Sequence, residues 1–201
     1  MVMTESTMMP LGTSMPAFEL PSTEGSVLKS ADLLGSKATV VLFICNHCPY
    51  VKHIAPALKA LTDTYTAKGC TFIAINSNDI ESYPEDDMEH MRQEKLERGY
   101  TFPYLLDESQ TVAKQFAAAC TPDIYVFNSE NILVYRGQFD DTRPYRISSG
   151  NYDSNKAPAH GADLAKALDT ILAGEDISGD QTPSIGCNIK WKSGNAPAYY
   201  G

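Results

Sequence analysis

Residues 38–56 read ATVVLFICNHCPYVKHIAP, and this stretch decides how the rest of the chain is interpreted. Its first eight residues form a β-branched and aromatic run, which is typical of a strand buried on both faces. From Pro49 to residue 68 the apolar residues recur at the spacing of one helical face. Proline suits a first helical turn because no amide hydrogen bond is lost there. The stretch therefore predicts a strand, a loop that contains Cys45 and Cys48, and a helix that Pro56 should kink.

The flanking sequence alternates in the same way between strand and helix patterns. Strands are predicted at 70–76, 105–106, 124–127 and 132–135, and helices at 85–98, 110–118 and 162–172. A β-hairpin followed by a helical turn is expected at 16–34, and a long surface loop at 137–160. This order predicts an α/β fold with a mixed central β-sheet flanked by helices. One domain is expected at 16–174, after a flexible N-terminus (1–15) and before an irregular C-terminal extension (175–201) that packs on it.

Composition narrows the functional classes. The 201 residues carry a formal net charge of −9, so phosphate backbones and anionic lipid surfaces would on average repel the protein. No apolar run approaches the length that crosses a bilayer, and the first residues lack the pattern of a secretion signal. We therefore expect a cytoplasmic protein with no nucleic-acid or membrane partner. Five cysteines are too few for a disulfide-stapled scaffold, which leaves catalysis, metal binding or burial.

The segment Cys45-Asn46-His47-Cys48-Pro49 is the strongest candidate for chemistry. It lies where a buried strand meets a helix N-terminus, where unpaired amides and the helix dipole stabilise an anion. A thiol there ionises near neutral pH and becomes a nucleophile. A second nearby thiol can attack the mixed disulfide that results and release the reduced substrate. The alternative is two inert cysteines at the end of an apolar strand.

At these residues the sequence resembles the thioredoxin-like superfamily, and within it the peroxiredoxin-like branch of redoxin and alkyl hydroperoxide reductase-like proteins. The resemblance covers about residues 16–172. A second match is Cys120-Thr121-Pro122-Asp123, whose proline precedes the last hairpin, as the cis-proline of that superfamily does. The resemblance implies a thioredoxin-like fold in which Pro122 is cis and the Thr121–Pro122 loop faces the cysteine segment.

Two alignments assign different nucleophiles. In one, Cys45 and Cys48 form a thioredoxin-type pair in which Cys48 resolves. In the other, Pro56 follows the nucleophile by eight residues, as the kinking proline does in thioredoxins. Cys48 is then the nucleophile, Val51 takes the place of the usual second thiol, and Cys45 is an extra thiol. We favour Cys48.

If Val51 occupies that place, another thiol must resolve the intermediate. The order expected from the sequence is Cys45, then Cys120, then Cys187, while Cys70 is expected in the core. His47 and Lys52 are candidates for tuning the thiolate, with a solvated or loop role as the alternative for each. The remaining histidines are expected at the surface or in loops: His53, His90 and His160.

Three functions are compatible with this pattern. The first is a thiol-disulfide oxidoreductase that acts on a disulfide in a protein or a small molecule and depends on an external thiol reductant. The second is a peroxiredoxin-like thiol peroxidase with an antioxidant role. Where the resemblance requires threonine and proline, however, the chain has Cys45 and Val41, or Leu42 and Ala38 if Cys45 is the nucleophile. The third is metal binding without turnover, by Cys45, Cys48 and a histidine. The first is favoured, as a monomer or homodimer without cofactor or resident metal.

Arg143 is a further candidate, in the segment GQFDDTRP at 137–144 after the predicted last hairpin. It can hold an anionic substrate group or pair with Asp140 or Asp141, and the ion pair is the expected role.

Overall fold

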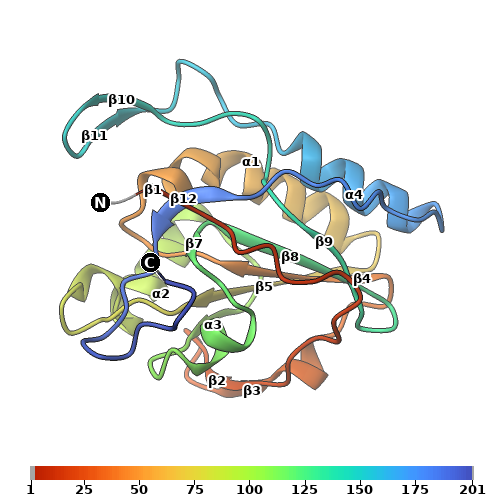
Figure 1. The fold of residues 1–201 in the computed structure, drawn as a ribbon, viewed down its shortest axis with the longest axis horizontal. Helices are drawn as coiled ribbons and strands as arrows, with labels where there is room; N and C mark the ends of the chain where they lie inside the picture. Colours follow the sequence, from red (N-terminus) through yellow and green to blue (C-terminus); the bar gives the residue numbers. More distant parts are fainter. Residues whose placement is uncertain (1–2, 201) are drawn as a thin grey trace.

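A five-stranded sheet runs through the centre of the protein in the order β6-β5-β4-β8-β9 (Figure 1). The computed structural model describes residues 3–200; residues 1, 2 and 201, which belong to the expected terminal segments, lie outside it. The strands are β4 (Ala38–Phe43), β5 (Cys70–Asn76), β6 (Tyr104–Leu106), β8 (Asp123–Asn128) and β9 (Leu133–Arg136). β4, β5 and β6 are parallel, and β8 is antiparallel to both β4 and β9. The mixed sheet is confirmed, and each strand lies within two residues of its predicted bounds.

β4 is the middle strand, and every one of its six residues is buried. It pairs along its whole length with β5 on one side and β8 on the other, so that Phe43 lies opposite Ile75 and Asp123. Apolar clusters cover both faces of the sheet, which explains why the sequence of β4 shows no polar alternation. The strand ends at Phe43, so the loop that contains Cys45 and Cys48 begins at one edge of the core.

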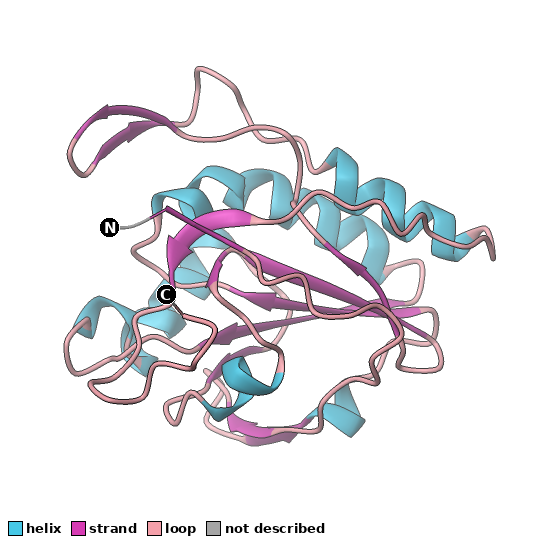
Figure 2. Cartoon of the chain, viewed as in Figure 1, coloured by secondary structure: helices cyan, strands magenta, loops and turns pink. Residues whose placement is uncertain are grey.

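Helices cover the two faces of the sheet unequally (Figure 2). The long helices α1 (Pro49–Thr66), α2 (Met88–Arg98) and α4 (Ala162–Leu172) contribute to one apolar cluster. The other cluster is covered by the short α3 (Thr111–Gln115) and by the predicted hairpin of β2 (Glu19–Pro21) and β3 (Val27–Lys29), which a 3₁₀ turn (Ser30–Leu33) follows. Among residues 3–200, no helix has both the length and the apolar character needed to span a bilayer.

The two ends of the chain meet in a second, smaller sheet. β1 (Met3–Glu5), β12 (Ile185–Asn188) and β7 (Cys120–Thr121) form it in the order β1-β12-β7, all antiparallel. Residues 3–5 of the segment expected to be flexible are therefore paired, and the extension expected to be irregular contains a strand. In Figure 1 the red N-terminal and blue C-terminal strands lie side by side, across the start of α1.

The segment 137–160 is not only a loop, as the sequence predicts. It contains a two-stranded hairpin of β10 (Tyr145–Ser148) and β11 (Asn151–Asp153), which projects beyond the start of α1 (Figure 1). Gly150 in its turn has a φ of 75°, which a glycine adopts without strain. The abundance of turn-forming residues hides this hairpin from sequence reasoning, because its strands are only three and four residues long.

Candidate active site

The loop between β4 and α1 is fixed by hydrogen bonds with two other segments. Asn46 accepts a hydrogen bond from the Tyr104 hydroxyl (3.0 Å) and donates one to the backbone oxygen of Glu85 (2.9 Å). Its own backbone amide donates to the Asp86 carboxylate (2.8 Å). These contacts leave Cys48 as the residue immediately before the first turn of α1, with Pro49 as the first helical residue. The cysteine that the alignment favours is therefore the one at the helix N-terminus.

Two groups from distant parts of the chain lie against the Cys48 sulfur. The carbonyl oxygen of Thr121 is 3.1 Å from Sγ, and the sulfur of Cys187 is 3.0 Å from it. The Thr121–Pro122 peptide bond is cis, as the resemblance predicts, and its loop faces the cysteine segment. Cys48 itself is completely buried.

The surroundings of Cys48 favour its ionised form. Burial alone would raise the pKa of Cys48, but hydrogen bonds from the Cys187 and Cys45 thiols and from the Thr121 hydroxyl outweigh it. The Val51 amide in the first turn of α1 acts in the same direction, so the pKa lies well below that of an ordinary thiol. Conversely, the hydrogen bond to Cys48 and burial raise the pKa of Cys187. Of the two sulfurs, Cys48 is therefore the one whose ionisation is favoured, and Cys187 is the one that holds its proton more tightly.

Cys187 reaches this position because β12 packs unusually closely on β7. Cys187 lies opposite Thr121 in the ladder. The preceding residue, Gly186, has no room for a side chain, since a Cβ there would lie 1.9 Å from the Thr121 carbonyl oxygen. A glycine at 186 is therefore a requirement of the approach that brings the two sulfurs together.

Cys45 and Cys120 lie nearby but in different environments. The Cys45 sulfur is 3.6 Å from the Thr121 hydroxyl, and burial, its hydrogen bond to Cys48 and the Asp86 carboxylate raise its pKa well above the usual value. The Cys120 sulfur contacts the backbone oxygen of Pro122 at 3.5 Å, and burial raises its pKa too. Cys70 is buried at the start of β5, as predicted. The five cysteines, all within residues 3–200, are reduced and not joined in disulfides.

His47 is held by a carboxylate that the sequence does not single out. Its Nδ1 lies 2.6 Å from Oδ2 of the completely buried Asp86. The same carboxylate accepts hydrogen bonds from the Asn46 amide and from the Asn78 side chain (2.7 Å). Asn78 in turn accepts from the Lys190 amide, three residues beyond Cys187. Asp86 therefore connects the cysteine loop to the C-terminal segment.

The side chains of Cys45, His47 and Asp86 place possible metal ligands within 4.8 Å of one another. The 2.6 Å separation of the imidazole and carboxylate atoms is that of a hydrogen bond and is too short for two ligands of one tetrahedral ion. The His47 and Asp86 side chains are used in hydrogen bonds that hold the cysteine loop. This arrangement fits an electrostatic and positioning role better than a metal site.

Among the other predicted tuning residue and the remaining histidines, His53 is the one whose environment differs from expectation. Lys52 is exposed on α1 and lines a shallow groove with His47 and Tyr152 of the β10–β11 hairpin. His53, expected at the surface, is buried, because the segment around Thr142 packs over it and the Thr142 hydroxyl lies 2.9 Å from Nε2. His90 and His160 are exposed, as predicted.

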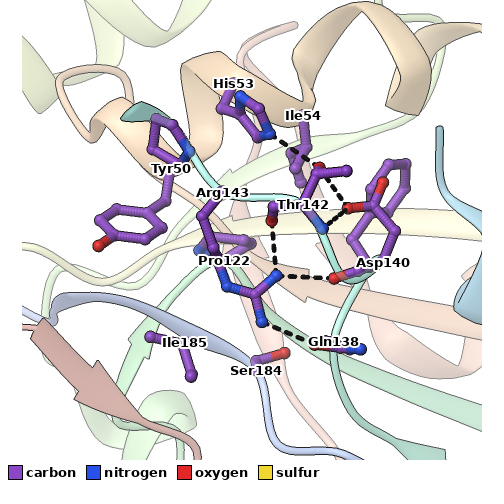
Figure 3. A pocket seen from close by; sticks show the side chains of 12 residues that line it. Tyr50, His53, Ile54, Pro122, Gln138, Asp140, Thr142, Arg143, Ser184 and Ile185 are labelled. Atoms are coloured by element: carbon purple, nitrogen blue, oxygen red, sulfur yellow. Dashed lines mark hydrogen bonds between the residues drawn. The ribbon is translucent and has the colours of Figure 1, made fainter. Parts of the chain in front are cut away.

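Arg143 does not form the ion pair expected with Asp140 or Asp141. Its Nη1 donates to the backbone oxygens of Asp140 (2.7 Å) and Thr142 (2.6 Å), and its Nη2 donates to the Gln138 side chain (2.6 Å). The Asp140 carboxylate is occupied by the amides of residues 142, 160 and 161 instead. In Figure 3 the Arg143 guanidinium lies near Pro122 and points towards the segment that contains Gln138 and Asp140.

Comparison with known proteins places this site in a family. The model of the AhpC/TSA family matches residues 11–136, which is more than half of the chain. The chain belongs to the AhpC/TSA family. No curated protein matches it.

Two solved structures are similar to this AhpC/TSA family member over nearly its whole length. An uncharacterised conserved protein from Geobacillus kaustophilus is 48% identical, covers 96% of this chain and 97% of its own, and has a TM-score of 0.88. A hypothetical protein from Sinorhizobium meliloti is 43% identical, covers 95% and 100%, and has a TM-score of 0.86. Peroxidoxin BcpB from Mycobacterium tuberculosis is 20% identical, covers 82% and 97%, and has a TM-score of 0.59. The thioredoxin-like fold is thereby confirmed.

The family match ends before the segment that supplies Cys187. From the sequence this thiol is the last of the three candidates, in a tail that could fold back, and 139 residues separate it from Cys48. Asp86 and Gly186 were missed altogether. Asp86 stands among other acidic residues in ESYPEDD, and nothing in its type separates it from its neighbours. Gly186, directly before a cysteine in an apolar context, is the one signal that could have indicated a close approach.

Proposed function

We propose that this AhpC/TSA family member is a thiol-disulfide oxidoreductase in which Cys48 attacks the substrate disulfide and Cys187 resolves the intermediate. One observation carries the proposal: the two sulfurs lie 3.0 Å apart, with Cys48 at the N-terminus of α1. Closing a disulfide of about 2.05 Å from that separation requires a movement of only about 1 Å. This order departs from the sequence expectation, in which Cys45 was the first candidate to resolve.

The proposed reaction begins with the Cys48 thiolate. It attacks one sulfur of the substrate disulfide, forms a mixed disulfide and releases the first substrate half as a thiolate. The Cys187 thiol then loses its proton to the departing sulfur and attacks Cys48 Sγ, which forms the Cys48–Cys187 disulfide and releases the second half as a thiol. Two electrons pass from the protein to the substrate. An external thiol reductant returns the protein to its dithiol form.

Access to Cys48 requires a movement, because the residue has no exposed surface. Of the segments against the sulfur, β12 is held to β7 by two residue pairs, Cys187 with Thr121 and Asn188 with Cys120, and its other pairing is the three-residue ladder with β1. A short ladder of this kind opens at a lower free-energy cost than the central sheet does. In the proposed cycle β12 moves aside to admit the substrate, and its return brings Cys187 to the mixed disulfide.

Cys45 has a supporting part in this scheme. Its raised pKa keeps it protonated, so that it donates to the Cys48 thiolate instead of competing as a second anion. The negative charge of Asp86 contributes to this, since a second anion next to it is unfavourable. The positions that the resemblance requires for peroxide binding hold Cys45 and Val41, which is why disulfide reduction is proposed ahead of peroxide reduction.

The test compares turnover of an insulin disulfide and of hydrogen peroxide by four proteins: wild type, Cys48→Ser, Cys187→Ser and, as the matched control, Cys70→Ala. We expect disulfide reduction to be lost in Cys48→Ser and retained in Cys70→Ala. Cys187→Ser should stall with a mixed disulfide on Cys48 that mass spectrometry detects. The proposal is refuted if Cys187→Ser turns over disulfides at the wild-type rate. Peroxide consumption that exceeds disulfide reduction would favour the thiol peroxidase instead.

A further inference from the structure

A small pocket adjoins the cis-proline loop at the start of α1. Tyr50, His53 and Ile54 of α1 form one wall, Pro122 lies at its base, and the segment 138–144 closes the opposite side (Figure 3). Including its open mouth, the pocket encloses about 280 Å³. The redox mechanism proposed above does not use it.

The pocket is next to the reacting sulfurs on both sides. Pro122 follows Thr121, whose carbonyl oxygen is 3.1 Å from Cys48 Sγ. Tyr50 lies two residues after Cys48, and Ile185, also in the lining, lies two residues before Cys187. Residues that line the pocket thus lie within two positions of both reacting cysteines, which puts the pocket beside the place where a disulfide would bind.

Arg143 supplies the pocket with a positive charge that is fixed in place. Its three hydrogen bonds go to two backbone carbonyls and to the Gln138 amide oxygen, all of them neutral acceptors. Within residues 3–200, no carboxylate oxygen lies within 4.0 Å of the guanidinium, although 25 acidic residues are in the chain. Three of the five N–H donors of the group are used in these bonds, which leaves two for a ligand.

The carboxylates nearest in sequence are turned to other partners. Asp140 accepts hydrogen bonds from the backbone amides of Thr142, His160 and Gly161, and the Asp141 carboxylate lies 3.1 Å from Nε2 of His160. The half-buried Arg143 side chain is thus positioned by the backbone but its charge is not neutralised. A planar guanidinium held in this way matches a carboxylate, which accepts two parallel hydrogen bonds from it.

We propose that this pocket is a carboxylate subsite and that the preferred substrate is a small disulfide with a carboxylate a few bonds from its sulfur. The inference rests on the proposed function and adds the substrate class. Arg143 binds the carboxylate while Cys48 attacks the nearer sulfur, and the electrons and protons are transferred as described above. A protein with a net charge of −9 otherwise disfavours an anionic substrate, so a preference for one must come from a local cation.

Three disulfides of nearly equal length and different end groups test the inference: dithiodipropionate (anionic), bis(hydroxyethyl) disulfide (neutral) and cystamine (cationic). The rate of Cys48 oxidation in the reduced protein is measured with each by quenching and mass spectrometry. The proteins are wild type, Arg143→Gln and, as a matched control, Arg146→Gln, whose arginine is exposed on β10. The ratio of rates within one protein is the readout, because partial misfolding would slow all three disulfides together.

We expect wild type and Arg146→Gln to react about tenfold faster with dithiodipropionate than with the neutral disulfide, and Arg143→Gln to lose that ratio. Equal rates with the three disulfides in wild type, or a ratio that survives in Arg143→Gln, would overturn the subsite and leave the oxidoreductase proposal standing. If Cys48 reacts with none of the three, the proposed function and the subsite are both overturned.

Discussion

Gly186→Ala is the substitution that most selectively separates Cys187 from Cys48. The added Cβ would lie 1.9 Å from the Thr121 carbonyl oxygen and 2.6 Å from its carbonyl carbon, both of them backbone atoms that no rotamer change can move. A carbon and an oxygen without a bond between them require about 3.3 Å. β12 must therefore retreat from β7 by more than about 1 Å. Because Cys187 is the next residue, the 3.0 Å separation of the two sulfurs increases by a similar amount.

The expected consequence is a weaker disulfide in a protein that still folds. Overpacking of this kind costs about 1–3 kcal/mol. The oxidised form requires β12 to be seated against β7, whereas the reduced form tolerates its displacement. The equilibrium constant for forming the Cys48–Cys187 disulfide should then fall by about 5- to 150-fold. In a two-electron couple this makes the reduction potential about 20–65 mV less negative.

The assay is equilibration of the protein in glutathione redox buffers, followed by acid quenching and quantification of the disulfide by mass spectrometry. Gly179→Ala is the matched control, because a Cβ there meets nothing within 4 Å and the residue lies in the same C-terminal extension. Circular dichroism and urea denaturation verify that both variants fold. A Gly186→Ala protein whose disulfide is as stable as that of wild type would refute the reasoning about how close packing of β12 positions Cys187.

Three further predictions concern charge. Cys187→Ala removes a hydrogen-bond donor to the Cys48 thiolate, so the pKa of Cys48 rises, and the midpoint of the pH profile of its alkylation by iodoacetamide should move to higher pH whatever the absolute rate. In Asp86→Asn an amide N–H group replaces the oxygen that accepts a hydrogen bond from the Asn78 side chain, so two donors face each other. Urea denaturation should therefore show a loss of about 3 kcal/mol in the free energy of unfolding. Burial raises the pKa of Asp123 to about 6, so the folded protein binds its proton more tightly than the unfolded chain does. The free energy of unfolding should therefore fall by up to about 3 kcal/mol as the pH rises from about 4 to about 6, and Asp123→Asn should abolish this fall. If the pH profile of unfolding is the same in Asp123→Asn as in wild type, the prediction is contradicted.

The fold could be predicted largely because its centre is encoded locally. β4 is a continuous apolar run, and the proline at the start of α1 marks the helix N-terminus, so the position of Cys48 followed from adjacent residues. The Thr121–Pro122 loop could be placed opposite it only through the family resemblance, since composition and periodicity carry no information about which loops meet. The structure confirms that Thr121–Pro122 is cis and that its loop lies against Cys48.

The parts that were missed depend on long-range packing. Cys187 reaches Cys48 through a four-residue strand that pairs with both β1 and β7, and four residues carry too little periodicity to be assigned. His53 is buried by Thr142, which lies 89 residues away. Asp86 has an acidic neighbour on each side and is distinguished only by being buried against the cysteine loop. In each case the role of the residue depends on a contact with a segment far away in the sequence, which local sequence patterns do not reveal.

The disulfide that forms first on oxidation identifies the thiol that resolves Cys48. Reduced wild-type protein is treated with less than one equivalent of a dithiol-specific oxidant, alkylated at low pH and digested, and the cross-linked peptides are identified by mass spectrometry. We expect a Cys48–Cys187 cross-link as the first and major product, with Cys45, Cys70 and Cys120 alkylated. A Cys45–Cys48 cross-link as the first product would contradict it.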